Sequence, residues 1–134
     1  MTYLLDTNTC VQMLRYGANS PVASKLAGVV TGDAVLCSVV IGELLFGALR
    51  SNDVAKNLAD VWTFAGGFKS LPLDDAAATE YAKVRADLAA KGTPIGPNDL
   101  LIAAIALSNG LTLVTHNTVE FSRVVGLPLD DWQI

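Results

Sequence analysis

Residues 1–6, with the sequence MTYLLD, decide how the rest of the chain is interpreted. Residues 3–5 (YLL) predict a short buried strand, and this strand ends directly at the carboxylate of Asp6. Thr7 and Asn8 follow, and residues of this kind favour the start of a helix. In an open α/β sheet, ligands bind in the crevice at the carboxyl ends of the strands. Asp6 is therefore a candidate site residue, although on spacing alone a plain helix cap explains it equally well.

Length and composition are those of one globular domain. The chain has 134 residues, of which 51% are hydrophobic and 16% charged, so we expect residues 1–134 to fold as a single domain with a substantial core. A net charge of −4 and a pI near 4.7 exclude a protein that coats DNA through a dense basic surface. They leave room for an enzyme that gathers a few basic residues at one nucleic-acid site.

Cysteine usage and the N-terminus indicate the cytoplasm. Cys10 and Cys37 each lie in an apolar segment and form no C-x-x-C motif, so we expect two buried thiols rather than a disulfide. Asp6 interrupts the apolar stretch that a signal peptide would need, and no basic residue precedes it. The longest apolar run, residues 34–49, contains Glu43 and is short for a membrane span. We therefore expect a soluble, cytoplasmic protein without membrane contact.

Hydrophobic periodicity predicts strands that alternate with helices. The predicted strands are 3–5, 34–38, 70–73, 111–115 and a short fifth one at 127–129, and the predicted helices are 7–16, 21–28, 38–50, 57–64, 74–90 and 97–109. Pro72 makes the third strand an edge candidate. Such alternation implies right-handed crossovers and a parallel sheet covered on both faces. The predicted fold is a three-layer α/β/α domain around a central parallel sheet of four to five strands.

Three acidic residues share an unusual setting, because each interrupts apolar sequence beside a strand end or a helix start. Asp6 ends the first strand, and Glu43 is the only charged residue between positions 34 and 49. Asp99 lies in the first turn of the helix that begins near residue 97. Other aspartates are interpreted as ordinary solvated turn, end or outer-face positions: Asp53, Asp60, Asp87, Asp130 and Asp131.

Carboxylates that are partly buried and close together favour a metal site. Two unit charges about 4 Å apart repel by about 4 kcal/mol at an effective dielectric constant of about 20. A cluster of three is tolerated only if a cation neutralises it or if protons are taken up. Oxygen ligands without a histidine or cysteine partner favour Mg²⁺, with Mn²⁺ as the other choice, over zinc. Such ions activate water and stabilise in-line displacement at phosphorus.

Other catalytic chemistries have little support. His116 is the only histidine, which excludes a metal-free ribonuclease that needs two, and we interpret it as a loop residue or substrate contact. The chain contains no G-x-S-x-G elbow and no phosphate-binding glycine loop. An aspartyl-nucleophile phosphohydrolase would need an acid where Asn8 stands. A receiver-like signalling module would need an acidic pair before the first helix, and none is present.

Five blocks of sequence carry a family resemblance: LLDTN, ELLFGAL, GPNDLLIAAIA, LVTHNTVEF and LPLDDW. Taken together and in this order, they resemble the signature blocks of PIN-domain proteins, and most of all those of VapC-type toxins of bacterial toxin–antitoxin pairs. The resemblance covers essentially the whole chain. It implies a Mg²⁺-dependent endoribonuclease that hydrolyses phosphodiester bonds in structured RNA, in several cases transfer RNA, at an acidic site on the sheet's carboxyl end.

The resemblance assigns a role to each acid. Asp6 matches the family's first acid and Asp99 its third, and both are metal ligands there. Glu43 matches the second acid, which completes the metal shell or positions the attacking water. Where the family often has a fourth acid this chain has Asn117, which supplies no charge and implies one tightly held ion. Glu120 matches the family's other acidic position.

Hydroxyl and basic side chains supply further candidates. A hydroxyl outside the metal shell can orient a carboxylate, and Thr7 and Ser38 are placed to do so. Five basic residues are candidates for phosphate contacts, although plain surface explains any one of them better: Arg15, Arg50, Lys83, Arg85 and Arg123.

The resemblance also implies partners. A cognate antitoxin would lay a helix in an apolar groove and hold the nuclease inactive, for which Leu45, Phe46 and Leu49 are candidates unless they pack in the core. A homodimer is expected, and DNA binding is expected of the antitoxin complex but not of the toxin alone. Two alternatives remain: a PIN-like RNA-processing nuclease outside a toxin–antitoxin pair, and a catalytically degenerate binding domain, against which the three retained acids argue.

Overall fold

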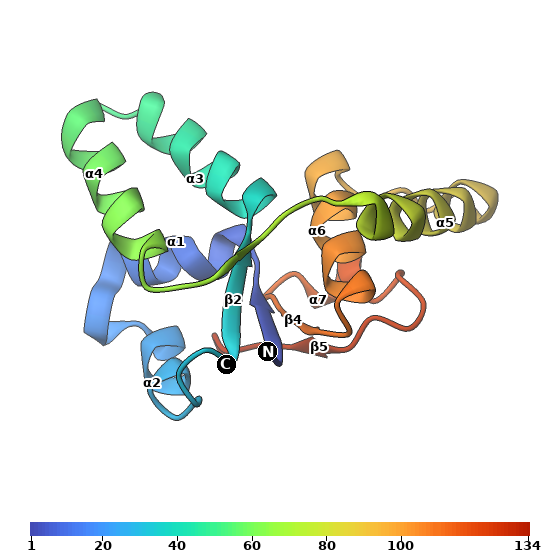
Figure 1. Ribbon diagram of the computed structural model, residues 1–134, viewed down its shortest axis with the longest axis horizontal. Helices are drawn as coiled ribbons and strands as arrows, with labels where there is room; N and C mark the ends of the chain where they lie inside the picture. Colours follow the sequence, from blue (N-terminus) through green and yellow to red (C-terminus); the bar gives the residue numbers. More distant parts are fainter.

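Five short strands form one parallel sheet in the computed structural model, which describes all residues from 1 to 134. The strands are β1 (Tyr3–Leu5), β2 (Ala34–Cys37), β3 (Ser70–Leu71), β4 (Thr112–Val114) and β5 (Leu129–Asp130). Their order is β3-β2-β1-β4-β5, and all four neighbouring pairs run parallel (Figure 1). The α/β fold, the parallel sheet and the edge position of the third strand are thereby confirmed.

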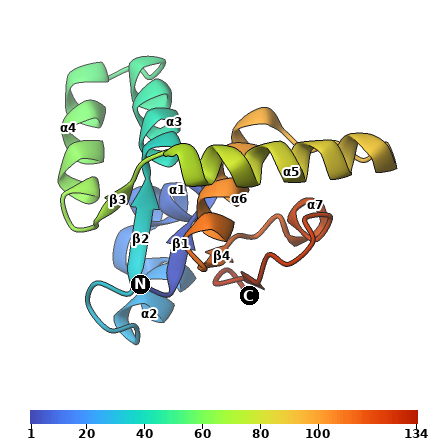
Figure 2. The same ribbon diagram turned by 45° about the vertical axis from the view of Figure 1, so that its right-hand side comes forward.

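Helices cover both faces of this sheet. They are α1 (Thr7–Tyr16), α2 (Pro21–Ala27), α3 (Ser38–Leu49), α4 (Val54–Ala65), α5 (Asp75–Lys91), α6 (Pro97–Ser108) and α7 (Thr118–Phe121), with a 3₁₀ turn, η1, at Gly17–Asn19. The chain moves from β1 to β3 in one direction and from β3 to β5 in the other. Right-handed crossovers therefore put α1 to α4 on one face and α5 to α7 on the opposite face (Figures 1 and 2).

The central strands are wholly apolar because they are buried on both sides. Leu4, Leu5, Val35 and Leu36 have no exposed surface, which is the pattern of a parallel sheet between two helical layers. The register pairs Leu5 with Val114 of β4. The carboxyl ends of β1 and β4 therefore lie at the same edge of the sheet.

Several boundaries differ from the predicted ones, and two of these differences have a clear cause. The fourth helix begins at Val54, three residues before the predicted start, because the side chain of Asp53 accepts a 3.3 Å hydrogen bond from Lys56 N and caps it. The fifth strand lies at residues 129–130, because Thr115 N donates to Asp130 O at 2.9 Å and fixes the pairing with β4.

The two cysteine thiols are buried and free, as expected. Burial is the main cause that raises the pKa of both Cys10 and Cys37. Both thiols are therefore protonated, inert parts of the core. None of the helices combines the length and the apolar character needed to cross a membrane.

Candidate active site

Asp6 lies at the junction of β1 and α1 and is 5% exposed. Its Oδ1 accepts a 2.9 Å hydrogen bond from Thr9 N, so Asp6 is the cap of α1. The chain leaves β1 towards β2 on one side, whereas β4 lies on the other side. The order of the strands therefore changes direction at β1, and such a point opens the crevice in which α/β sheets bind ligands. Asp6 is therefore both a helix cap and a buried carboxylate in that crevice.

The surroundings of Asp6 disfavour its ionised form. Burial raises its pKa most, and the negative charge of Glu43 raises it further. Hydrogen bonding from Thr115 and Thr9 lowers the pKa in part, and the net direction is upward. A buried carboxylate whose pKa is raised in this way favours a nearby cation, because the cation offsets the cost of burying the negative charge.

Glu43 extends from α3 and is held at both oxygens. The hydroxyl of Thr7 donates a 2.6 Å hydrogen bond to Oε1, and Asn98 Nδ2 donates a 3.3 Å hydrogen bond to Oε2. Thr7 thus makes the contact expected of it. Ser38 does not, because its hydroxyl donates instead to the backbone oxygen of Leu71 at 3.5 Å. The starts of α1 and α6 together fix the orientation of this carboxylate.

Asp99 is half-buried in the first turn of α6 and lies beside Glu120. The pKa of Asp99 is raised to about 6, first by burial and then, in this order, by the charges of Glu120, Glu43 and Asp6. A side chain at Gly96 would place its Cβ 3.3 Å from Asp99 Oδ2 and 3.7 Å from Glu120 Oε1. The bare backbone of Gly96 is therefore part of the site, and its N–H donates a 2.7 Å hydrogen bond to Glu120 Oε1.

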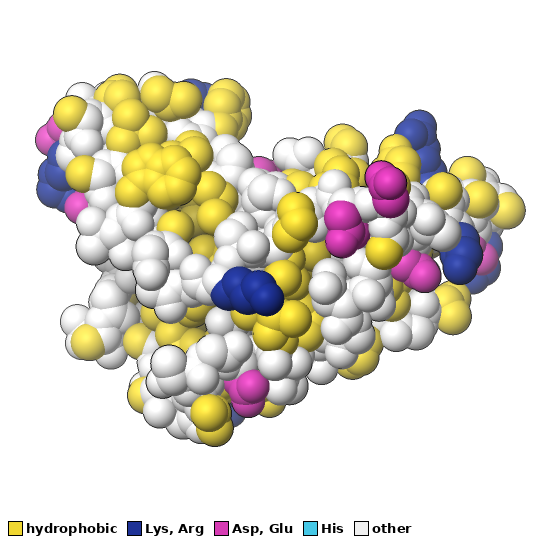
Figure 3. All heavy atoms as spheres, in the orientation of Figure 1, with side chains coloured by type: hydrophobic (Ala, Val, Ile, Leu, Met, Phe, Trp, Pro, Cys, Tyr) yellow, Lys and Arg dark blue, Asp and Glu magenta, His cyan; other side chains and the backbone are white.

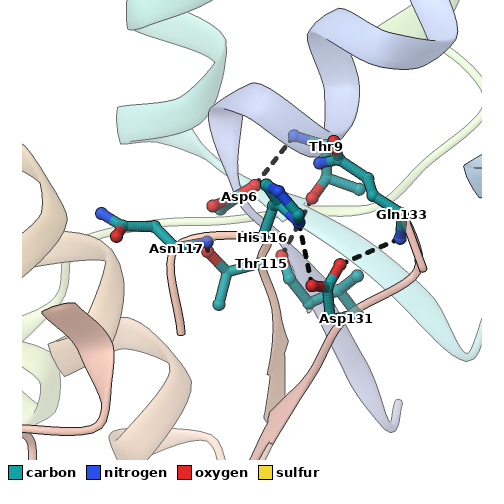
Figure 4. A network of polar contacts seen from close by, with 8 residues as sticks. Asp6, Thr9, Thr115, His116, Asn117, Asp131 and Gln133 are labelled. Atoms are coloured by element: carbon teal, nitrogen blue, oxygen red, sulfur yellow. Dashed lines mark hydrogen bonds and ion pairs between the residues drawn. The ribbon is translucent and has the colours of Figure 1, made fainter. Parts of the chain in front are cut away.

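Asn117 contacts an acid instead of replacing one. It precedes α7, its backbone N–H donates to Thr115 Oγ1 at 3.0 Å, and its Nδ2 donates to Glu120 Oε2 in a short contact. Glu120 is therefore the fourth acid that faces the crevice, and Asn117 orients it. Figure 4 shows the Asn117 side chain on the side towards which the Asp6 carboxylate points.

The structure brings the three predicted acids and Glu120 to one end of the sheet. No three of the acidic, histidine or cysteine side chains are gathered tightly enough to hold an ion as they stand. Their donor set nevertheless suits a hard divalent cation, since every donor is an oxygen and the charges of the other three acids already disfavour ionised Asp99. The residues present thus fit a Mg²⁺ or Mn²⁺ ion by chemistry and by charge.

Most of the predicted phosphate contacts are engaged elsewhere. Arg50 lies over the ring of Phe46, Lys83 pairs with Glu80, Arg85 donates to the hydroxyl of Tyr81, and Arg123 donates to the backbone oxygen of Pro94. Figure 3 shows basic side chains scattered over one face with no continuous stripe. Arg15 alone among the five lines hollows that also include Glu43 or Asn117.

A pair that the sequence did not reveal joins the segment after β4 to the C-terminal segment. His116 Nδ1 and Asp131 Oδ2 are 2.9 Å apart, and Gln133 N donates to Asp131 Oδ1 at 2.9 Å (Figure 4). The side chain of Asp131 is 12% exposed, so its interpretation as an ordinary solvated aspartate is wrong. The cause is the return of the C-terminal segment beside β4, a long-range pairing that no local pattern signals.

Comparison with known proteins identifies the family. The model of the PIN domain matches residues 3–127. A protein from Shigella flexneri named tRNA(fMet)-specific endonuclease VapC is 39% identical over 133 residues, covering 98% of both chains. A crystal structure of DNA-bound VapBC from Salmonella typhimurium superimposes with a TM-score of 0.92 at 36% identity, covering 98% of each chain. A VapBC structure from nontypeable Haemophilus influenzae has a TM-score of 0.90 at 29% identity over the full length of both chains.

The matches extend over the elements that position the acids. They include β1 and Asp6, α3 and Glu43, and α6 and Asp99, because each alignment covers nearly the whole chain. Both the family model and the full-length relatives agree with the fold that the sequence predicted. The chain therefore belongs to the PIN-domain family, among the VapC ribonucleases of bacterial toxin–antitoxin pairs.

Proposed function

We propose that the protein is a toxin endoribonuclease that uses a divalent cation, Mg²⁺ or Mn²⁺, to hydrolyse phosphodiester bonds in RNA. The observation that carries this proposal is the gathering of Asp6, Glu43, Asp99 and Glu120 at one end of the sheet, where burial and then the charges of Glu120, Glu43 and Asp6 raise the pKa of Asp99 to about 6. Four carboxylates that repel one another in this way are best explained by a cation that they share.

The roles of the residues follow from their places. Asp6 and Asp99 would hold the ion, since their pKa values are the ones that burial and neighbouring charge raise. A bound divalent ion neutralises phosphate charge and acidifies water. Glu43, fixed by Thr7 and Asn98, would orient the attacking water and accept its proton. One tightly held ion is proposed, because Asn117 stands where the family often has a further acid, and its uncharged amide is engaged by Glu120.

A cleavage assay with matched variants tests the metal mechanism. Asp99→Asn should reduce RNA cleavage to background, whereas Glu80→Gln should keep the wild-type rate because Glu80 pairs with Lys83 on the outer face of α5. Treatment of the wild type with a chelator should stop cleavage, and added Mg²⁺ or Mn²⁺ should restore it. Wild-type cleavage in the chelator would refute the metal role.

Transfer RNA is the substrate class that the relatives favour, and we propose it for this chain. The Shigella flexneri protein, 39% identical, is named for cleavage of tRNA(fMet). Incubation of the protein with initiator tRNA, elongator tRNA and an unstructured RNA of equal length would separate the possibilities. Preferential cleavage of one tRNA supports the proposal, and equal cleavage of all three contradicts it.

An apolar groove between α1, α3 and α4 is the proposed antitoxin site. Its volume is about 360 Å³, and its apolar wall includes Leu14, Leu44 and Val61. Phe46 and Leu49 are 59% and 58% exposed, so core packing does not explain them, and apolar side chains gather over α3 and α4 in Figure 3. A groove of this kind suits the apolar face of an antitoxin helix.

Co-purification tests the groove. The product of a small neighbouring reading frame, expressed together with the wild type in the cytoplasm, should co-purify with it and inhibit its nuclease activity. Leu14→Glu should abolish binding, whereas Val30→Glu, at a position 73% exposed and outside the groove, should not. Light scattering of the free toxin would test the proposed homodimer, and a gel-shift assay should show operator DNA binding only with the antitoxin present.

A further inference from the structure

A second hollow, of about 460 Å³, lies on the other flank of α1 and is polar. One wall is a single face of α1, formed by positions 8, 11, 12 and 15 at helical spacing. The opposite wall comes from the segment after β4 and from the C-terminal segment. Val11 is its one apolar residue, and the polar residues are Asn8, Gln12, Arg15, His116, Asn117 and Gln133. This set is referred to below as the His116 hollow.

The side chains of the hollow offer both charge and hydrogen bonding. Arg15 takes part in none of the salt bridges of the protein, so its guanidinium is available to an anion. The amides of Asn8, Gln12 and Gln133 each carry two donors and an acceptor. Together they match a nucleotide. The guanidinium suits its phosphate, and the amides suit the edge of its base, which presents hydrogen-bond donors and acceptors of its own.

His116 is held in place by an anchor of its own. Its side chain is 60% exposed, whereas that of its partner Asp131 is only 12% exposed and is fixed by the N–H of Gln133. Because Nδ1 is engaged by Asp131, Nε2 is the ring nitrogen left for a ligand. Figure 4 shows the His116 ring joined to Asp131. An exposed imidazole is thus fixed in a hollow that also includes Asn117, which donates to Glu120 of the acidic site.

We propose that the His116 hollow binds the nucleotide of the RNA substrate next to the scissile phosphate. Arg15 and His116 contact its phosphate, and the amides contact its base. This inference rests on the proposed ribonuclease function and adds a substrate subsite to it. The position supports it, because Asn8 is two residues from Asp6 and Asn117 bonds to Glu120. The apolar groove on the other flank of α1 shares Val11 and Arg15 with the His116 hollow, but it contains neither His116 nor the amides of Asn8, Gln12 and Gln133.

The only histidine of the chain is a direct reporter of this site. We would follow the imidazole resonance of His116 by NMR in the Asp99→Asn variant, in chelator, while adding a short single-stranded oligoribonucleotide. The resonance should shift as RNA binds, and fluorescence anisotropy should give the affinity. In the same background, Arg15→Ala should weaken binding at least about fivefold and reduce the salt dependence of log K by about one phosphate contact.

Two controls separate a specific subsite from general charge. Lys91→Ala removes an equal charge at the far end of α5, where Lys91 pairs with Asp87, and should leave RNA affinity unchanged. Asp131→Ala should weaken binding by releasing the imidazole. Asp131→Asn should restore part of it, because the amide keeps one acceptor oxygen where Asp131 uses two, for His116 and for Gln133. This rescue distinguishes a positioning role for Asp131 from a purely structural one.

The outcomes for the hollow and for the nuclease are distinguishable. If RNA binds while the His116 resonance does not move and Arg15→Ala keeps full affinity, the subsite is refuted and the ribonuclease stands. If the wild type cleaves no RNA but the variant binds RNA with the expected Arg15 and His116 dependence, the subsite stands and the nuclease proposal fails. Absence of any RNA binding overturns the subsite.

Discussion

The hydroxyl of Thr7 donates a 2.6 Å hydrogen bond to Oε1 of Glu43, and this contact joins the start of α1 to α3. Asn98, at the start of α6, donates to the other carboxylate oxygen. Glu43 is thus oriented by the same two helices that carry Asp6 and Asp99 at their starts. The orientation of one acid is therefore built into the arrangement of the other two.

Thr7→Val tests this orientation, because it keeps the branched shape and removes the donor. Loss of such an outer contact typically lowers activity about 10- to 100-fold, so we expect RNA cleavage to fall by about tenfold. The free energy of unfolding should fall by only about 1 kcal/mol, the usual net value of one hydrogen bond. Ser38→Ala is the matched control, since Ser38 donates only to Leu71 O. Equal loss of cleavage in both variants would contradict the role of Thr7.

Two variants of Asp6 separate its role as the cap of α1 from its proposed role as a metal ligand. Asp6→Asn removes the charge but keeps an oxygen that can cap α1, whereas Asp6→Ala removes both. In chelator, Asp6→Asn should melt at or above the wild-type temperature, because burial already disfavours the charged form. Asp6→Ala should lose about 1 kcal/mol of stability, the usual cost of a lost cap. Both should lose cleavage. Marked destabilisation of Asp6→Asn would show that the carboxylate is chiefly structural.

The pattern of the sequence was sufficient for the fold because its signals are local. Apolar residues on both faces of a strand, as in Leu4 and Leu5, are typical of a buried parallel sheet. Gly17 and Pro97 mark the end of α1 and the start of α6. The sequence predicts Asp6, Glu43 and Asp99 as site residues because each is an acid within apolar sequence, and parallel strands bring their carboxyl ends together.

The remaining parts of the site depend on long-range contacts. By sequence Asn117 stands in the place of an acid, and only its contact with Glu120 in the fold shows that it orients one. The sequence around Asp131 predicts a solvated residue, because nothing local indicates that the C-terminal segment returns beside β4 to meet His116. Such pairings join parts of the chain whose approach is fixed by the whole fold, and no periodicity encodes them.

The pKa of Asp99 makes the stability of the metal-free protein depend on pH. Its folded-state pKa of about 6 lies above the ordinary value of 3.8, so between these pH values the native state binds more protons than the unfolded state. Stability should therefore fall as the pH rises from about 4 to about 6. Two pH units correspond to about 3 kcal/mol, and screening of the half-exposed side chain leaves about 1 kcal/mol.

Urea unfolding in chelator at pH 4.5 and pH 7 measures this effect. The loss of stability towards pH 7 should be smaller in Asp99→Asn than in the wild type, and added Mg²⁺ at pH 7 should restore the wild type alone. An identical pH dependence in the two proteins would mean that Asp99 does not titrate in the raised range.

The variant Asn117→Asp tests the contact between Asn117 and Glu120. The change removes the donor to Glu120 and places a second negative charge against it. In chelator at pH 7 we expect a loss of about 1–2 kcal/mol in the free energy of unfolding, because a hydrogen bond is replaced by repulsion. Asn117→Ala, which removes the donor without adding charge, should lose less. Addition of Mn²⁺ should recover the stability of Asn117→Asp but not that of Asn117→Ala, since only a charge deficit is repaired by a cation. If Asn117→Asp were as stable as the wild type in chelator, Glu120 and Asn117 would not be in contact in solution, and Asn117 would not orient Glu120.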